Sequence, residues 1–264
     1  MTAPGVRRVR GLHGRGLWSL YRFGMLRLAR FGLEVFAGPV LSALLFLLVF
    51  SVALGETQTV GGGLTFQQYL VPGLVLFTLT HSAFDMAAFP LVYDKMEGTV
   101  QDVLMSPLSP AEQAAGYALP GATAGLVTGG ATLALAALVV PLPWTAPWLA
   151  AGFALGTASL FALVGVMVGL WARKWDQLAL ADTFLMLPLA FLSGAFFTLE
   201  GLPPLGRDLI ALNPVFHAID GARLGLLGQA QGAPGPAAAI LLAMNLLAAL
   251  LAWRLFARGY RLKA

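Results

Sequence analysis

Long apolar runs dominate the chain, and polar residues interrupt them at intervals. A helix rises about 1.5 Å per residue, so about 20 apolar residues are needed to cross the ~30 Å hydrocarbon core of a bilayer. Six runs approach or exceed that length, at residues 33–54, 70–93, 112–140, 147–171, 178–199 and 236–256. They are continuously apolar rather than alternating, which argues against a transmembrane β-barrel. The pattern predicts an all-α membrane protein with six transmembrane helices.

Composition supports this class. Of 264 residues, 58% are apolar and only 11% are charged, whereas a soluble domain carries about 25% charged residues. So few charges cannot cover the surface of a soluble protein, and so much apolar surface excludes disorder. The chain has no cysteine, which removes disulfides, thiolate nucleophiles and Cys-ligated metals.

The positions of Lys and Arg predict the orientation. Fourteen of the 16 cations lie before the first run, after the second and fourth runs, or in the C-terminal tail. Only Arg207 and Arg223 fall in the loops of the opposite side. Because cytoplasmic loops are enriched in Lys and Arg, we expect both termini in the cytoplasm.

Residues 1–32 form a basic segment with an amphipathic part. On a helical projection of residues 17–31, one broad face collects Leu17, Trp18, Leu20, Tyr21, Met25, Leu28 and Phe31. The other face holds Arg15, Arg22, Arg27 and Arg30, with Phe23 and Leu26 as exceptions. This pattern predicts a helix lying in the cytoplasmic membrane interface. A basic tail without fixed structure is the alternative.

The loop at 94–112 predicts a short helix between two long ones. Gly98 ends the preceding helix, Thr99 can cap a new one with Asp102 as partner, and Pro107 disfavours helix at Ser106.

A second helix start follows within the same loop. Ser109 is the expected N-cap, Pro110 stands at the first helical position, and Glu112 completes a capping box.

The loop is also acidic. Asp94, Glu97, Asp102 and Glu112 oppose the single Lys95, a net charge of −3. An electropositive partner surface would explain this charge, and a solvated connector would fit it equally well.

The loop at 200–235 is long for structureless chain. It contains the turn Leu202-Pro203-Pro204 and then Asn213, a good N-cap, before Pro214 at the first helical position. The following helix is apolar on much of its surface, so we expect short external helices that re-enter the outer membrane face.

Several pieces together resemble one family. They are Tyr69-Leu-Val-Pro-Gly73, Glu97-Gly-Thr-Val-Gln-Asp-Val-Leu-Met-Ser-Pro107, Phe191-Leu-Ser-Gly-Ala-Phe-Phe197, Leu202-Pro-Pro204 and Leu212-Asn-Pro214. In order and spacing the chain resembles the ABC-2 type transporter permeases, most closely the bacterial inner-membrane permeases for multidrug or polysaccharide export. The resemblance covers nearly the whole chain, whose transmembrane domain would span residues 33–264.

The resemblance implies partners. Two six-helix subunits would pair as a homodimer in the bacterial inner membrane, and two copies of a separate ATPase subunit would dock below them. The loop after the second span would be the coupling helix that contacts the ATPase, through Glu97, Gly98, Thr99, Val100, Asp102, Val103, Leu104 and Ser106.

Two further sets of residues follow from the resemblance. The helix along the inner face, in contact with membrane lipid, would include Trp18, Tyr21, Arg22, Arg27 and Arg30. The outer cap would include Pro203, Pro204, Asn213 and Pro214.

Catalytic motifs are not found in the sequence. The glycine run at 61–63 lacks the GxxxxGK[ST] pattern that cradles phosphates, and neither HExxH nor GxSxG occurs. We therefore expect no catalytic residue, metal site, cofactor or nucleic-acid partner in this chain, and we expect ATP and Mg²⁺ to be bound by the partner subunit.

Ionisable residues within spans are costly and suggest function. His81 and Asp85 are four residues apart and share a helix face. They would line a substrate path or form a pair that fixes packing. For Asp182 we expect a salt bridge to the basic pair at 173–174, and for Asn245 an interhelical hydrogen bond.

These observations favour the permease subunit of an ATP-binding-cassette exporter that moves an amphipathic, lipid-like, glycan or drug substrate outward. One alternative is an ion-coupled secondary carrier, for which His81 and Asp85 are the candidate pair. The other alternative is a non-transporting membrane scaffold.

Overall fold

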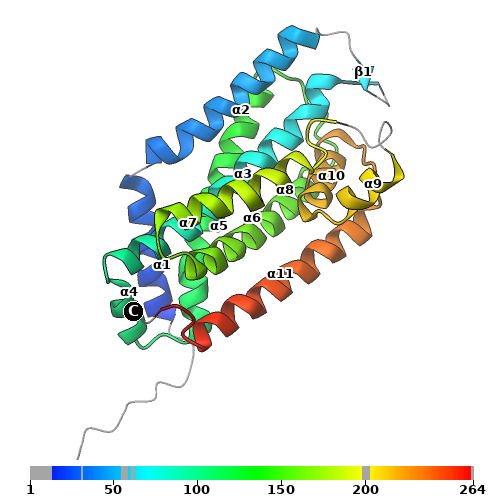
Figure 1. Cartoon of the computed structure of the whole chain (residues 1–264). Coiled ribbons are helices and arrows are strands. Elements are labelled where there is room, and N and C mark those ends of the chain that lie inside the picture. Colours follow the sequence, from blue (N-terminus) through cyan, green and yellow to red (C-terminus); the bar gives the residue numbers. More distant parts are fainter. Residues whose placement is uncertain (1–13, 31, 55–58, 61–62, 198–202, 263–264) are drawn as a thin grey trace, which may run out of the picture.

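The computed structural model describes residues 14–30, 32–54, 59–60, 63–197 and 203–262. They form a bundle of long helices (Figure 1). Five described helices are long and apolar enough to cross a membrane: α2 (Gly32–Leu54), α3 (Phe66–Met96), α5 (Pro110–Ala137), α6 (Pro147–Trp171) and α11 (Pro234–Ala257). Each corresponds to one of the predicted runs.

The predicted span at 178–199 has a different form. Its place is taken by α7 (Trp175–Ala181), the π-helix η1 (Asp182–Met186) and α8 (Leu187–Phe191). Pro188 has no N–H to donate, and its ring crowds the carbonyl four residues earlier. Just before it, the Leu187 N–H bonds the Asp182 carbonyl, five residues back, and not the carbonyl four residues back as in an α-helix. This segment is therefore shorter than the predicted fifth span, and its π-helical turn is wider than an α-helical one.

The core is built around α3, which makes its most extensive contacts with α5 and α6. Glycines of α5 permit the close approach. A Cβ on Gly121 would lie 2.7 Å from the Ala83 carbonyl oxygen, and one on Gly125 would lie 2.7 Å from that of Leu79. Small residues let helix backbones pack in this way inside membranes.

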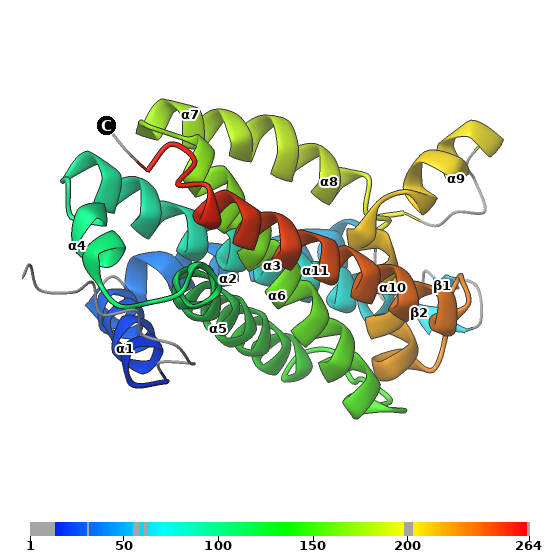
Figure 2. The ribbon, with the colours of Figure 1, turned by 90° about the horizontal axis from the view of Figure 1, so that it is seen from below.

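The remaining elements gather at the two ends of the bundle. At one end lie α1 (Gly14–Arg30), α4 (Val100–Met105) and the C-terminal end of α11 (Figures 1 and 2). At the other lie the antiparallel strands β1 (Thr59–Val60) and β2 (Leu64–Thr65) with α9 (Pro204–Ala211) and α10 (Pro214–Leu227). This grouping matches the two sides predicted from charge.

Parts of two predicted regions lie outside the described residues. These are residues 1–13 of the basic N-terminal segment and residues 198–202 around the start of the external loop.

The packing of α5 on α3 gives a first prediction. Gly125→Leu would force the side chain into the α3 backbone, a clash that costs about 1–3 kcal/mol. Thermal unfolding of the purified protein in detergent should show a lower Tm. Gly130→Leu is the matched control on the same helix, because a Cβ there meets nothing within 4 Å. Equal losses in both variants would contradict the proposed packing.

Candidate functional site

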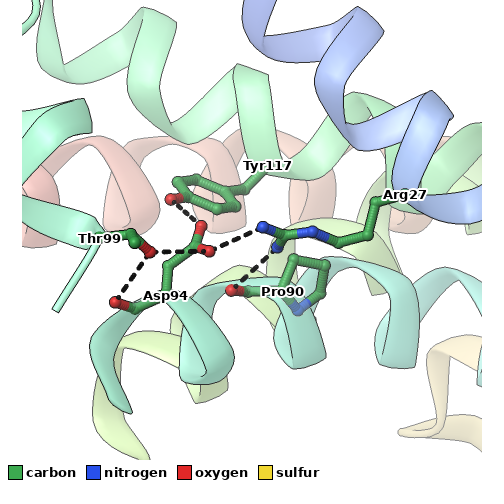
Figure 3. A network of polar contacts seen from close by, with 5 residues as sticks. All are labelled: Arg27, Pro90, Asp94, Thr99 and Tyr117. Atoms are coloured by element: carbon green, nitrogen blue, oxygen red, sulfur yellow. Dashed lines mark hydrogen bonds and ion pairs between the residues drawn. The ribbon is translucent and has the colours of Figure 1, made fainter. Parts of the chain in front are cut away.

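The carboxylate of Asp94, near the end of α3, collects contacts from three other segments (Figure 3). Arg27 Nη2 on α1 donates to Asp94 Oδ1 at 2.9 Å, and Arg27 Nη1 donates to the Pro90 carbonyl at 3.4 Å. The Tyr117 hydroxyl on α5 donates to Asp94 Oδ2 at 2.8 Å. The Thr99 hydroxyl, just before α4, donates to Oδ1 and to the main-chain oxygen of Asp94. One side chain thus joins α1, α3, α5 and the start of α4.

The Arg27–Asp94 ion pair is mostly shielded from solvent. Its side chains are 18% and 7% exposed. The guanidinium also lies over the rings of Phe23 and Tyr93, at 4.8 and 5.4 Å from their centroids. Removing one partner of a buried pair leaves an uncompensated charge, which is strongly destabilising. The helix predicted for this segment is present as α1. Its Arg27 joins it to α3 through the ion pair with Asp94.

The short predicted helix is present as α4, and its start differs from the prediction. Gly98 has φ of +76°, a conformation that favours glycine. Thr99 was expected to cap α4 through its side chain, and this was wrong. Its backbone is helical, it makes no cap hydrogen bond, and its hydroxyl is bound to Asp94 instead.

The end of α4 and the start of α5 follow the prediction. Ser106 is extended and ends α4. The Glu112 N–H donates to Ser109 Oγ at 3.3 Å, and the Ser109 N–H donates to Glu112 Oε2 at 2.8 Å. This is the predicted capping box, with Pro110 at the first turn.

Only part of α4 faces outward. Its exposed side, with the preceding turn, consists of Glu97, Gly98, Thr99, Gln101, Asp102 and Met105. Val100 is buried in the core, and Val103 and Leu104 are partly buried against it. Val100 was expected on the contact surface, and in this chain it is 5% exposed; the contact itself stays a prediction.

The acidity of the loop is also partly internal. Asp94 is paired with Arg27, and Glu112 closes the capping box. Lys95 Nζ donates to the Leu170 carbonyl at 2.9 Å and to the Ala172 carbonyl, at the end of α6. Glu97 and Asp102 remain as the exposed carboxylates of the loop.

At the opposite end, three side chains hold the backbone of residues 189–197, which we call the clasped segment. Asn213 Nδ2 donates to the Leu189 carbonyl at 2.7 Å, and Arg223 Nη2 donates to that of Gly194 at 2.8 Å. The Tyr69 hydroxyl donates to the carbonyl of residue 197 at 2.9 Å. These bonds come from α3, from the N-cap of α10 and from α10 itself.

Arg223 is a buried charged residue of this end, at 2% exposed, as is Asp220 on the same helix. Its guanidinium lies 3.7 Å from the centroid of the Tyr69 ring. Burial lowers the pKa of Arg223 to about 10, while Tyr69 and Asp220 act to raise it, so the guanidinium is still cationic at neutral pH. Backbone carbonyls and an aromatic face compensate this cation in place of a contacting carboxylate.

The predicted start of α10 is confirmed. Asn213 Oδ1 accepts from the Val215 N–H at 2.9 Å, and Pro214 follows at the first helical position. The helix is buried on most of its surface and packs on α3, α6 and α11. Pro203 is exposed, and Pro204 begins α9.

The intramembrane polar residues meet across helices. His81 Nδ1 on α3 lies 3.5 Å from Asp182 Oδ1 on η1, and Asp85 is close enough for its charge to interact with both. Among the described residues, no salt bridge joins Asp182 to the basic pair at 173–174, so that prediction was wrong. The proximity of Asp182 to His81 was missed, because 101 positions separate them in sequence.

Asn245 makes the predicted interhelical hydrogen bond. It accepts from Ser159 Oγ at 2.8 Å and donates to the Gly156 carbonyl at 2.9 Å, which joins α11 to α6. No group of three or more His, Asp or Glu within the described ranges is placed to hold a metal ion.

Comparisons with known proteins agree with this architecture. The profile of the ABC-2 type transporter family matches residues 15–227. The inner membrane transport permease YadH of Escherichia coli K12 is 28% identical over 253 residues, covering 96% of this chain and 99% of YadH. Nodulation protein J of Rhizobium leguminosarum bv. viciae is 26% identical over 224 residues, covering 83% and 84% of the two chains.

The family match begins in α1 and ends at the last residue of α10, so it includes the Asp94 contacts, α4 and the clasped segment. The five long apolar helices are consistent with repeated membrane crossing. The chain therefore belongs to the ABC-2 type transporter family and is a multi-pass transport permease of the inner membrane.

Proposed function

We propose that this chain is the membrane-spanning subunit of an ATP-driven exporter, and that a separate ATPase subunit acts on it through α4. ABC-2 permeases normally work with an ATPase subunit. The observation that carries the proposal is the Asp94 carboxylate, which ties the start of α4 to α1, α3 and α5. A displacement of α4 would therefore move the inner ends of the spans together.

The exposed side of α4 suits a docking surface. Glu97 and Asp102 present two carboxylates, and Met105, the last residue of α4, is 77% exposed. Complementary charge orients a partner and speeds its association, while an exposed thioether adapts to an apolar pocket. Val100 anchors the helix from the other side, so a force on the exposed side would reach the core.

We extend the proposal to a homodimer that carries two ATPase copies, with ATP and Mg²⁺ bound by the ATPase. Asp182 lies in the predicted fifth span with 39% of its side chain exposed. A charged group facing lipid at membrane depth costs at least about 2.5 kcal/mol. Its exposed edge would therefore face a second subunit or a water-filled path. The α2 helix, of whose residues 36–53 only 17% are buried in this chain, would border that seam.

For the cargo, we propose an amphipathic compound such as a lipid-like molecule, a glycan carried on a lipid, or a hydrophobic drug. The spans present mostly apolar walls, and within them His81, Asp85 and Asp182 bring ionisable side chains together. This group would lie on the substrate path.

The same polar group favours a second candidate, the ion-coupled carrier, because carboxylates and imidazole in a membrane are typical of proton relays. The scaffold hypothesis has no such structural feature in its support.

Docking at α4 gives a prediction. In the double variant Glu97→Lys and Asp102→Lys, like charges would replace attraction at the electropositive surface of the ATPase. Retention of the co-expressed ATPase by the tagged permease should fall at least about tenfold, measured by quantitative pull-down. Asp208→Lys, an exposed substitution on α9 at the other end, should leave retention unchanged. Full retention by the double variant would overturn the docking site.

The energy source gives another prediction. Efflux of a fluorescent amphipathic dye from cells that express the permease and its ATPase should persist when a protonophore collapses the proton gradient at normal ATP. It should stop when ATP is depleted. Efflux that stops with the protonophore, and that Asp182→Asn also abolishes, would establish the ion-coupled carrier instead. A deletion strain that loses a membrane complex but no efflux would establish the scaffold.

A further inference from the structure

A cavity of about 900 Å³ opens between α1, α3, α4 and α5, beside the Arg27–Asp94 pair. This is near the upper end of the ~300–1,000 Å³ that ligand pockets occupy. Most of its lining is apolar, including Leu20, Phe23, Leu26, Met86 and Phe89. Apolar walls with a few charged groups at one side are the usual form of a site for an amphipathic ligand.

The cavity is set by fixed contacts of α1 with its neighbours. Gly24 on α1 lies against Pro120 on α5, where a Cβ would come within 2.5 Å of the proline ring, and Gly116 on α5 receives the Leu20 side chain. On its other side α1 is held to α3 by the bond from Arg27 to Asp94. Because α1 is fastened on both sides, the space cannot close by a simple shift of the helix.

One arginine of the cavity lining has no acidic partner among the described residues and is available to an anion. The four arginines of α1 face no acidic residue on the same helix. Arg27 and Arg30 line the cavity, together with the carboxylates of Asp94 and Asp102. Asp94 is neutralised by Arg27. Arg30 is exposed and makes no hydrogen bond or ion pair with any residue that the structure describes.

The location selects a lipid among anions. Arg30 is the last residue of α1, and α2 begins at Gly32, with its apolar segment from Phe36. The mouth therefore lies where headgroups meet acyl chains. Phe23 and Leu26 on α1 are 54% and 59% exposed, and Phe89 on α3 is 39% exposed. These apolar surfaces border the cavity, and an acyl chain would cover them.

We propose that this cavity binds an anionic phospholipid, with its phosphate at Arg30 and an acyl chain between Phe23, Leu26 and Phe89. The bound lipid bridges α1 and α3 on both sides of the Arg27–Asp94 pair and also touches α4 through Val103. It thereby supports the contact that positions α4. Only this last effect rests on the proposed function, since binding itself requires neither ATPase nor cargo.

The test uses the full chain, delipidated in a mild detergent and mixed with micelles that contain either palmitoyl-oleoyl phosphatidylglycerol or palmitoyl-oleoyl phosphatidylcholine. Native mass spectrometry then measures how much phospholipid stays bound. The wild type should retain phosphatidylglycerol at least about fivefold better than phosphatidylcholine. Equal retention of the two lipids would overturn the anionic assignment.

Two variants and one control locate the site. Arg30→Gln removes the phosphate partner and Met86→Trp fills the cavity, so each should lower phosphatidylglycerol retention at least about fivefold. Arg22→Gln makes the same charge change on α1 at an exposed residue that does not line the cavity, and it should retain the lipid. Arg30→Gln alters an exposed side chain and should fold normally, as checked by gel filtration. Equal retention by Arg22→Gln and Arg30→Gln would refute this site, whether or not the protein exports anything.

Discussion

The buried carboxylate of Asp94 is the contact on which the arrangement of the inner end depends. It accepts hydrogen bonds from Arg27 on α1, Tyr117 on α5 and Thr99 before α4. Breaking a fully buried ion pair costs about 3–5 kcal/mol, and the 18% exposure of Arg27 reduces that figure. No single helix can move away without leaving a charge or a hydroxyl unpaired. A short helix of six residues is thereby attached firmly to the bundle.

The outer end is held by a different kind of interaction. Main-chain carbonyls of the clasped segment accept hydrogen bonds from Tyr69, Asn213 and Arg223. This segment begins within α8, directly after the π-turn and Pro188. Between the two ends, α3 packs on α5 and α6 through glycine contacts that leave little room for sliding. The Arg27–Asp94 ion pair holds the inner end, and the hydrogen bonds to the clasped segment hold the outer end. A tightly packed bundle held in this way is suited to transmit a displacement from one end to the other.

The sequence predicted the features that depend on patterns along the chain. It did not predict which side chains would contact one another in the folded protein. The five long helices and the Ser109 capping box depend on neighbouring residues and were foreseen. Thr99 was given a cap role because the sequence did not show that Asp94, five residues earlier, would be the acceptor of its hydroxyl. The pairing of Arg27 with Asp94 crosses 67 positions, so only their opposite charges at the same membrane level hinted at it. The π-turn at Asp182 is a local feature that was also missed: the bond from the Leu187 N–H to the Asp182 carbonyl spans five residues instead of the four of an α-helix.

We propose that Asp94 carries motion from α4 to the outer end. Because the chain has no cysteine, Ser193→Cys would place a unique thiol in the clasped segment, at a residue that is 1% exposed. The direct measurement is the labelling rate of this thiol by a membrane-impermeant maleimide, with the ATPase subunit bound, in the presence and absence of ATP. We expect ATP turnover to accelerate labelling of the Ser193→Cys thiol. In the protein that also carries Asp94→Asn, we expect no acceleration while ATP hydrolysis continues. The same acceleration in the Asp94→Asn protein would contradict the proposal.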